Sequence, residues 1–332
     1  MIEVIFPVAD RHTTSSCGGS LFFLGINFYL VGGKRIKSPS HCEEIMKKLP
    51  RVALIYDFDG TLSPGNMQEF GYMKTIGADK DAFWAENDRL TRENDACSIL
   101  CYMHLMLREA EDKGVVLSRE KFRDFGADVK LYEGVRDWFA SIRAYGFKLG
   151  LDIHHYINSS GLKEIIEGTP IASSFDAIYA SSYLYDPKTG RPMWPAVAVD
   201  YTTKTQFIFK INKGIREVSD TRKINDFLPE AERPVPFSHM IYYGDGATDI
   251  PCMKVVRDHG GHSIAVYKPG DEEAKKVAVR LINENRVNFA TPANYREGKM
   301  LDKLTRRILD KIAADNEFDR LERINKRRYR NS

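Results

Sequence analysis

The chain has 332 residues, with 49 Lys and Arg against 46 Asp and Glu, which leaves a formal net charge of +3. So small a charge excludes bulk electrostatic attraction to nucleic acid, and no nucleic-acid partner is expected. The length favours one large core with a smaller second unit. Five cysteines, an odd number with no Cys-x-x-Cys pair, do not form a disulfide framework and indicate a reducing compartment such as the cytoplasm.

Residues 1–48 are interpreted as an N-terminal extension of doubtful role. The apolar run 21–31 is shorter than the ~20 residues of a spanning helix and is interrupted by a glycine and an asparagine, so no membrane partner is expected. A signal peptide is disfavoured because acidic residues stand where positive charge is expected. Met46 is a reasonable alternative start, and we expect the fold to form without residues 1–45.

The apolar run Val52–Tyr56 predicts a buried parallel strand that leads into the segment Asp57-Phe58-Asp59-Gly60-Thr61. Because side chains alternate along an extended chain, Asp57 and Asp59 point the same way. Gly60 lets the backbone turn and approach a ligand closely. An Asp-Gly turn that closes a β-hairpin is the alternative, but no matching alternating strand follows.

Residues 65–132 predict a helical insertion, because apolar residues recur at helical spacing within a charged segment. Cys97, Cys101 and His104 also share helical spacing, and core packing is preferred over a metal site because a fourth ligand is missing. Four large side chains could line a pocket or pack helices, and packing is again preferred: Phe83, Trp84, Tyr102 and Met103.

Helices and strands alternate through the rest of the chain. We expect a helix over 134–146, a strand over 147–158, a β-hairpin from 177–185 and 196–201, strands over 240–243 and 263–267, helices over 271–279 and 299–312, and a solvated basic tail over 326–330. His154 and His155 are given no catalytic role. Ser159-Ser160-Gly161 ends one strand, and a helix starting at Leu162 would offer an anion site, although an ordinary N-cap serine is the alternative.

This alternation predicts an α/β fold, a Rossmann-like parallel sheet covered by helices on both faces, with ligands at the carboxyl ends of the strands. We divide the chain into an α/β core (49–64 and 133–296), a helical cap (65–132) and a C-terminal helix with a basic tail (297–332). At ~4 Å and an effective dielectric of ~20, each pair of carboxylates at this edge repels by on the order of 4 kcal/mol. A lysine and a divalent cation are therefore required, and oxygen ligands from Asp57 and Asp245 suit Mg²⁺.

The order Asp57-x-Asp59-Gly-Thr, a later serine at a strand end, Lys204, and Gly244-Asp245-Gly-x-Thr-Asp249 resembles the four motifs of the haloacid dehalogenase superfamily. The insertion after the first motif resembles the small helical cap of its phosphoserine-phosphatase-like branch. The resemblance covers residues ~50–290 in organisation. The residues with which phosphoserine phosphatases grip the amino acid have no clear counterpart here, so phosphoserine is not named as the substrate.

By this resemblance Asp57 is the nucleophile that forms an aspartyl-phosphate, and Asp59 protonates the leaving oxygen and then activates water. Mg²⁺ is held by Asp57, the backbone carbonyl of Asp59, and Asp245, with Asp249 in support. The resemblance assigns the phosphoryl oxygens to Thr61, the Ser159 hydroxyl, the Ser160 amide and Lys204. Ser159 is preferred over Ser160 as the hydroxyl ligand, because Ser160-Gly161 then opens the helix.

The leading hypothesis is a Mg²⁺-dependent phosphatase that hydrolyses a small phosphorylated metabolite. A phosphomutase or phosphotransferase, which passes the same aspartyl-phosphate to a second substrate group, is the nearest alternative. A non-catalytic protein that binds partners through the cap is a further alternative, disfavoured because the nucleophile and metal ligands are all present. Neither the oligomeric state nor the particular substrate follows from the sequence.

Overall fold

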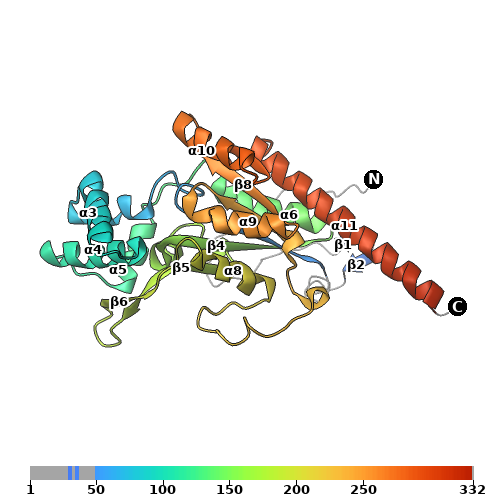
Figure 1. Cartoon of the computed structure of the whole chain (residues 1–332), viewed down its shortest axis with the longest axis horizontal. Helices are drawn as coiled ribbons and strands as arrows, with labels where there is room; N and C mark the ends of the chain where they lie inside the picture. Colours follow the sequence, from blue (N-terminus) through green and yellow to red (C-terminus); the bar gives the residue numbers. More distant parts are fainter. Residues whose placement is uncertain (1–28, 32–33, 37–48, 331–332) are drawn as a thin grey trace, which may run out of the picture.

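The computed structural model describes residues 29–31, 34–36 and 49–330 (Figure 1). Most of the extension 1–48, including its alternative start at Met46, lies outside the described residues, and its dispensability stays a prediction. Within it, β1 (Tyr29–Val31) and β2 (Lys34–Ile36) pair antiparallel. In the part of the chain that the structure describes, no helix combines the length and the apolar character needed to cross a bilayer.

A seven-stranded sheet forms the centre of the protein, in the order β6-β5-β4-β3-β7-β8-β9. All neighbouring strands are parallel except β5 and β6, which form a hairpin as expected, although its second strand is Pro192–Val197 and not 196–201. The strands are β3 (Arg51–Tyr56), β4 (Asp152–Leu162), β5 (Ala177–Tyr185), β6 (Pro192–Val197), β7 (Met240–Gly244), β8 (His262–Tyr267) and β9 (Phe289–Pro292). The middle position of β3 places the residues that follow it at the centre of the carboxyl edge.

Helices cover both faces of this sheet, which confirms the predicted fold class. Alternate residues of β3 pack on opposite sides: Leu54 lies in one core cluster with α6 and α11, and Ile55 lies in another with α8, α9 and α10. Both side chains are fully buried, as expected for a parallel strand between two helical layers. The covering helices are α6 (Val135–Lys148), α8 (Thr203–Asn212), α9 (Ile250–Asp258), α10 (Glu272–Asn283) and α11 (Met300–Arg330).

A group of helices between β3 and α6 lies at one end of the molecule (Figure 1). It comprises α2 (Tyr72–Ile76), α3 (Lys80–Glu93), α4 (Ser98–Asp112) and α5 (Arg119–Gly126). Helix α5 packs against α7 (Lys163–Glu167), the short helix that follows β4.

The prediction of core packing is wrong for His104, which is exposed, while Cys97 and Cys101 are half-buried. Among the described residues, none of these three belongs to a group that could hold a metal.

Several expected boundaries are wrong. Gly146 does not end α6, because it sits inside the helix where a Cβ would lie 2.2 Å from Ile153, so the glycine serves close packing. Strand β4 accordingly starts later than expected, at Asp152. Strand β9 was missed, since it has only four residues and no clear alternation. Helix α10 runs to Asn283 rather than 279.

Helix α11 is much longer than the expected 299–312. It continues to Arg330, so the basic segment 326–330 is part of a helix. Beyond Ile312 the helix is stabilised by exposed ion pairs one turn apart, such as Lys326 with Glu322, instead of by burial. The apolar periodicity therefore fades although the helix does not, and a prediction based on periodicity stops too early.

His154, at the start of β4, is held between two carboxylates. Its Nδ1 lies 2.8 Å from Asp176 Oδ1 and its Nε2 lies 2.8 Å from Asp152 Oδ2. Burial lowers the pKa of His154, but the two aspartates outweigh burial and raise it to about 9. Arg143 also contacts Asp176, at 3.0 Å, and His154 helps to lower the Asp176 pKa to about 2 against its burial. The histidine is thus a structural cation.

Because the folded-state pKa of His154 lies above its unfolded value, its stabilisation is complete below about pH 6.5 and is lost as the pH rises through about 9. His154→Gln should lower the free energy of unfolding by on the order of 2–3 kcal/mol near pH 6 and change it little near pH 10. Urea unfolding at both pH values measures this, with the exposed His104→Gln as control. An equal loss at both pH values would contradict the assignment.

Candidate active site

The carboxyl ends of β3, β4 and β7 meet at one cleft. Because these strands are parallel neighbours, the residues that follow them gather at the same edge of the sheet. The cleft has a volume of about 470 Å³, and its floor includes Asp57, Asp59, Ser159, Ser160 and Asp245. The structure therefore brings together most of the residues singled out in the sequence.

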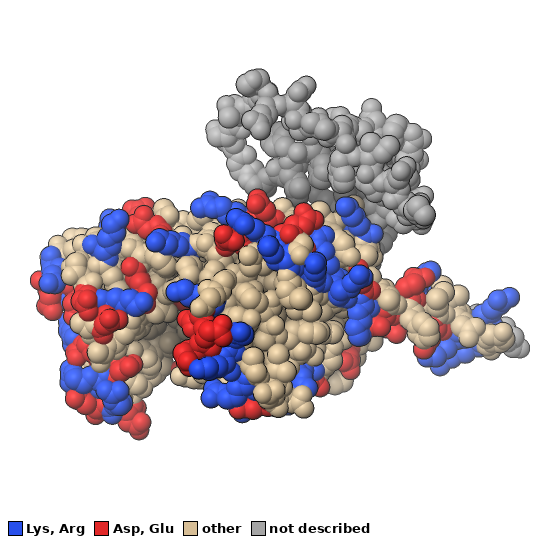
Figure 2. Space-filling view, turned by 90° about the horizontal axis from the view of Figure 1, so that it is seen from above, with Lys and Arg blue, Asp and Glu red and all other residues tan. Residues whose placement is uncertain are grey.

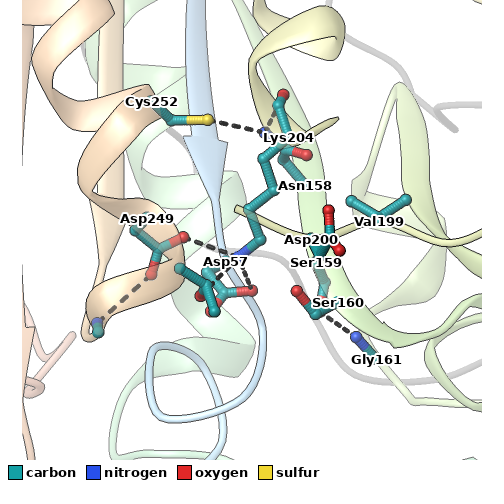
Figure 3. A network of polar contacts seen from close by, with 12 residues as sticks. Asp57, Asn158, Ser159, Ser160, Gly161, Val199, Asp200, Lys204, Asp249 and Cys252 are labelled. Atoms are coloured by element: carbon teal, nitrogen blue, oxygen red, sulfur yellow. Dashed lines mark hydrogen bonds and ion pairs between the residues drawn. The ribbon is translucent and has the colours of Figure 1, made fainter. Parts of the chain in front are cut away.

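Asp57 lines this cleft and is buried, with its carboxylate directed at a lysine from α8 (Figure 3). Its backbone N–H donates to the Tyr243 carbonyl at 2.9 Å, which fixes the strand end. The Asp57 Oδ1 lies 3.1 Å from Lys204 Nζ. Burial and the nearby Asp249 raise the Asp57 pKa to about 6, against the opposing effect of Lys204. The carboxylate is thus held charged mainly by one buried cation.

Lys204 is fully buried and is shared by two acids. Its Nζ donates to Asp249 Oδ1 at 2.8 Å and to Thr248 Oγ1 at 3.3 Å, besides its contact with Asp57. Burial lowers the Lys204 pKa, but Asp249 and Asp57 outweigh burial and raise it above the usual lysine value. Lys204 is therefore a permanent positive charge, despite its complete removal from solvent.

Two neighbours fix this cation and its partner. The Asn158 side chain donates to the Lys204 backbone carbonyl at 3.1 Å. The Tyr242 hydroxyl donates to Asp249 Oδ1 at 2.7 Å. Figure 3 shows Asn158 beside Lys204. The ion pair is therefore rigidly oriented by groups outside the cleft.

Three carboxylates form the single group in the described part of the chain that could hold a metal ion. One oxygen each of Asp57, Asp245 and Asp249 lies within 4.8 Å of the others. Burial, Asp57 and Asp249 raise the Asp245 pKa well above its usual value, which shows that Lys204 alone does not offset three acids. Hard oxygen donors with uncompensated negative charge fit Mg²⁺. Asp59 contributes no carboxylate oxygen to this group.

Asp59 faces the cleft from the turn after β3. Its Oδ1 accepts a hydrogen bond from the Met67 backbone N–H at 2.9 Å. Burial and Asp57 raise its pKa well above the usual carboxyl value. Burial therefore favours the protonated form of this carboxyl group more than water would.

Two glycines allow the close approach of these acids. Gly60 has φ +73°, and a Cβ there would lie 1.9 Å from Asp245 Oδ2. A Cβ on Gly161 would lie 2.1 Å from Met67 Cε and 3.0 Å from Asp59 Oδ2. A side chain at position 60 would therefore be strained by the positive φ as well as crowded by Asp245, and one at position 161 would displace the end of the Met67 side chain.

The predicted hydroxyl ligands differ in their surroundings. Ser159 Oγ accepts from the Gly161 N–H at 3.1 Å, whereas Ser160 Oγ is buried without a hydrogen-bond partner. Thr61 Oγ1 is also buried and unpartnered, and Thr61 lies outside the cleft lining. The helix expected to open at Leu162 begins at Lys163 and has five residues, with no side-chain cap. The alternative of an ordinary N-cap serine is therefore wrong, because Leu162 stands at the N-cap, and the anion site stays a prediction.

The cleft lining also contains a polar cluster that the sequence did not reveal. Glu69 accepts from Asn66 Nδ2 at 2.8 Å and from Trp84 Nε1 at 3.1 Å, and it pairs with Lys80 at 2.9 Å. All four residues line the cleft. No spacing signal links them, because the cluster joins a turn after β3 to the start of helix α3.

Trp84 and Tyr102 line the cleft, so packing alone is the wrong interpretation for these two residues. The Tyr102 hydroxyl donates to the Ser160 carbonyl at 2.8 Å and ties helix α4 to the end of β4. Phe83 and Met103 are buried, as the packing interpretation predicts.

Comparison with known proteins identifies the class to which this architecture belongs. The sequence profile of the haloacid dehalogenase-like hydrolases matches residues 54–254. A Borreliella burgdorferi protein named only as uncharacterized is 32% identical over 287 residues, which span 79% of this chain and 96% of that protein.

Two solved structures are also similar in fold. A probable phosphoserine phosphatase from Vibrio cholerae is 15% identical, with a TM-score of 0.47 over 85% of this chain and 70% of that chain. A HAD family hydrolase from Salmonella enterica serovar Typhi is 15% identical, with a TM-score of 0.46 over 74% of this chain and 68% of that chain.

The family match begins within β3 and ends within α9, so it encloses the whole acidic cluster and the buried lysine. The mostly parallel sheet with helices on both faces is a Rossmann-like α/β fold. More particularly, the chain belongs to the haloacid dehalogenase-like hydrolase family.

Lys204→Met should lower the free energy of unfolding by about 3–5 kcal/mol without added divalent metal, because Asp57 and Asp249 are then buried without their cation. Urea unfolding followed by circular dichroism measures this. Lys254→Met is the control, since Lys254 is half-exposed and pairs with Asp258 at the surface, where such pairs contribute under about 1 kcal/mol. A loss no larger than that of the control would show that the buried pair does not hold the site together.

Proposed function

We propose that the protein is a Mg²⁺-dependent phosphatase that hydrolyses a small phosphomonoester through an aspartyl-phosphate intermediate. The observation that supports this most directly is the placement of Asp57. Its carboxylate lies at the bottom of an open cleft, 3.1 Å from a fully buried lysine and within 4.8 Å of two further metal-ligating acids. A nucleophile for phosphoryl transfer needs this combination of access, fixed orientation and charge compensation.

In this proposal one oxygen of Asp57 attacks phosphorus and forms the aspartyl-phosphate, while the alcohol oxygen of the substrate leaves. Lys204 holds the carboxylate in place and offsets the negative charge that gathers on phosphate and nucleophile. Since Asn158 fixes the backbone of Lys204 and Tyr242 fixes Asp249, the cation does not need to reorganise during the reaction.

Asp59 is the proposed acid and base. Its raised pKa favours the protonated form, so the side chain can donate a proton to the leaving oxygen. After donation the same carboxylate can accept a proton from the water that attacks the aspartyl-phosphate. The Met67 N–H, at 2.9 Å, holds the side chain toward the cleft for both steps.

Mg²⁺ would be held by Asp57, the backbone carbonyl of Asp59, and Asp245, with Asp249 in support. When bound, the ion would supply charge neutralisation for the phosphoryl oxygens. The carboxylates already meet the donor requirement, because they are hard oxygen ligands gathered in excess of the single lysine.

The proposed phosphate ligands are Lys204, the hydroxyl of Ser159 and the amide of Ser160, with Thr61 as a further predicted contributor. The unpartnered hydroxyl of Ser160 favours it as an additional donor, because a buried hydroxyl without a partner costs free energy until a ligand supplies one. Thr61 is fully buried, so we assign it a role behind the phosphate site rather than within the cleft.

We further propose that residues 65–132 act as the substrate-selecting cap of a phosphoserine-phosphatase-like member of the family, set on the core 49–64 and 133–296. Trp84, Glu69 and Lys80 line the wall that the organic part of the substrate would meet. A small phosphorylated metabolite suits a cleft of about 470 Å³. The odd cysteine count favours a reducing compartment such as the cytoplasm.

Asp57→Asn should abolish turnover, because an amide is a poor nucleophile. Release of inorganic phosphate from a panel of phosphometabolites, with Mg²⁺ present, measures this. Asp258→Asn on the exposed end of α9 is the matched control and should keep wild-type activity. More than about a tenth of wild-type turnover in Asp57→Asn would contradict the nucleophile assignment. Adding acceptor alcohols to the wild-type assay separates hydrolysis from phosphoryl transfer.

Asp59→Asn should slow hydrolysis of the aspartyl-phosphate more than its formation, because attack by water needs the general base. Quenched reactions should therefore show covalent phosphate retained on the Asp59→Asn protein, detected by mass spectrometry. Normal breakdown of the intermediate in this variant would show that another group is the base.

Excess EDTA should abolish phosphatase activity without unfolding the core, because a site of acid oxygens and water binds Mg²⁺ moderately. Activity and circular dichroism are measured on the same sample, and added Mg²⁺ should restore turnover. Ca²⁺ should inhibit, because its longer and looser coordination misplaces the nucleophile. Full activity in excess chelator would rule out the metal requirement.

A further inference from the structure

The distal half of α11 extends beyond the sheet and its covering helices. In Figures 1 and 2 this part of the helix projects from the body of the described protein, and Figure 1 shows its last turns at the opposite end of the molecule from α3, α4 and α5. Every residue from Glu317 to Arg330 is exposed. No residue over 313–330 is buried, and these 18 residues form about 27 Å of helix. A helical segment without buried side chains gains little stability from core packing, so its length calls for a physical reason.

The projecting segment carries large apolar side chains. Phe318 is 65% exposed, and Leu321 and Ile324 are each 50% exposed. Successive steps of three residues keep these side chains on one side of the helix, on neighbouring turns. The segment therefore presents an apolar stripe, which we define as Phe318, Leu321 and Ile324, without a partner among the described residues.

Charge is distributed unevenly along the same segment. Residues 315–322 contain four acids and one base, a net charge of −3, whereas residues 323–330 contain five bases and no acid, a net charge of +5. The apolar stripe spans the junction of the two halves. The charge pattern is therefore antisymmetric about the middle of the stripe, near Leu321.

We infer that α11 is a self-association element, in which the distal halves of two copies pack antiparallel through the apolar stripe. Antiparallel pairing centred on Leu321 sets the acidic half of each copy against the basic half of the other. A parallel pair would instead set like charges together along the whole length, which is destabilising. The charge pattern therefore favours a second copy of the chain as the partner, and it favours the antiparallel orientation over the parallel one.

A second copy fits this segment better than a membrane or a nucleic acid does. Residues 326–330 are basic enough to contact either polyanion. However, the four acids of residues 315–322 flank the same stripe and would be repelled by an anionic surface. A single helix pair of about 27 Å also buries less than the ~800 Å² per partner of a standard interface, so the dimer should be concentration-dependent.

The first test is sedimentation velocity on the full chain over a range of concentrations. Wild type should shift from monomer to dimer with concentration, and Leu321→Asp should weaken self-association at least about tenfold. Val116→Asp, which places the same charge on an equally exposed aliphatic position in the helical insertion, should leave self-association unchanged. Because Leu321 is exposed to solvent, the melting temperature of Leu321→Asp should match that of the control. An unchanged melting temperature then shows that weaker self-association is caused by the lost helix pairing and not by unfolding.

The second test decides the direction of pairing. An all-basic variant replaces the four acids with lysine (Asp315→Lys, Glu317→Lys, Asp319→Lys and Glu322→Lys). An all-acidic variant replaces four bases with glutamate (Arg323→Glu, Lys326→Glu, Arg327→Glu and Arg330→Glu). Each variant alone should be monomeric, because its two halves now carry the same sign, and an equimolar mixture should form a heterodimer.

A wild-type chain that stays monomeric up to the highest soluble concentration would overturn the inference. The same holds if the chain binds anionic vesicles or duplex DNA through residues 326–330 but does not self-associate. Dimerisation that survives Leu321→Asp would also overturn it, since the interface would then lie elsewhere. These outcomes do not depend on phosphatase activity, so they are independent of the proposed function.

Discussion

The site depends on one buried ion pair network, in which Lys204 bridges Asp57 and Asp249. A buried carboxylate without a cation takes up a proton, and a protonated Asp57 could not act as a nucleophile. Lys204, fully excluded from solvent and 3.1 Å and 2.8 Å from the two acids, keeps both charges in the interior. The surrounding hydrogen bonds from Asn158 and Tyr242 are needed because a misplaced buried cation would leave either acid uncompensated.

The parallel sheet makes this network possible. Strands β4, β3 and β7 are neighbours, so their carboxyl ends deliver groups from three distant chain segments to one place. Close approach is then limited by side-chain volume, and Gly60 and Gly161 remove that limit where a Cβ would collide with Asp245 or Met67. The acids are therefore near one another because of backbone topology, and their mutual repulsion is a consequence that Lys204 only partly offsets.

The helical insertion contributes part of the cleft lining and is joined to the core at the site itself. Tyr102 donates to the carbonyl of Ser160, so the insertion touches the same segment that carries the predicted phosphate ligands. The cluster around Glu69 lines the same cleft as the acids. Helix α11 is separate from this arrangement: its proximal half packs on the sheet, and its distal half is free of contacts that would involve the cleft.

The sequence by itself determined the central strand, the acids that follow it and the α/β class. A fully buried parallel strand is recognisable as a short apolar run, and aspartates and a glycine directly after such a strand indicate a ligand site at its carboxyl end. It also marked Lys204, Asp245 and Asp249 through their place in ordered motifs. Only the tertiary structure decided that the Ser160 hydroxyl is unpartnered while the Ser159 hydroxyl accepts a hydrogen bond, and that Trp84 and Tyr102 line the cleft, since packing and hydrogen bonding between distant segments leave no local pattern. The length of α11 was also hidden from the sequence, because without burial a helix loses the apolar period on which sequence prediction relies.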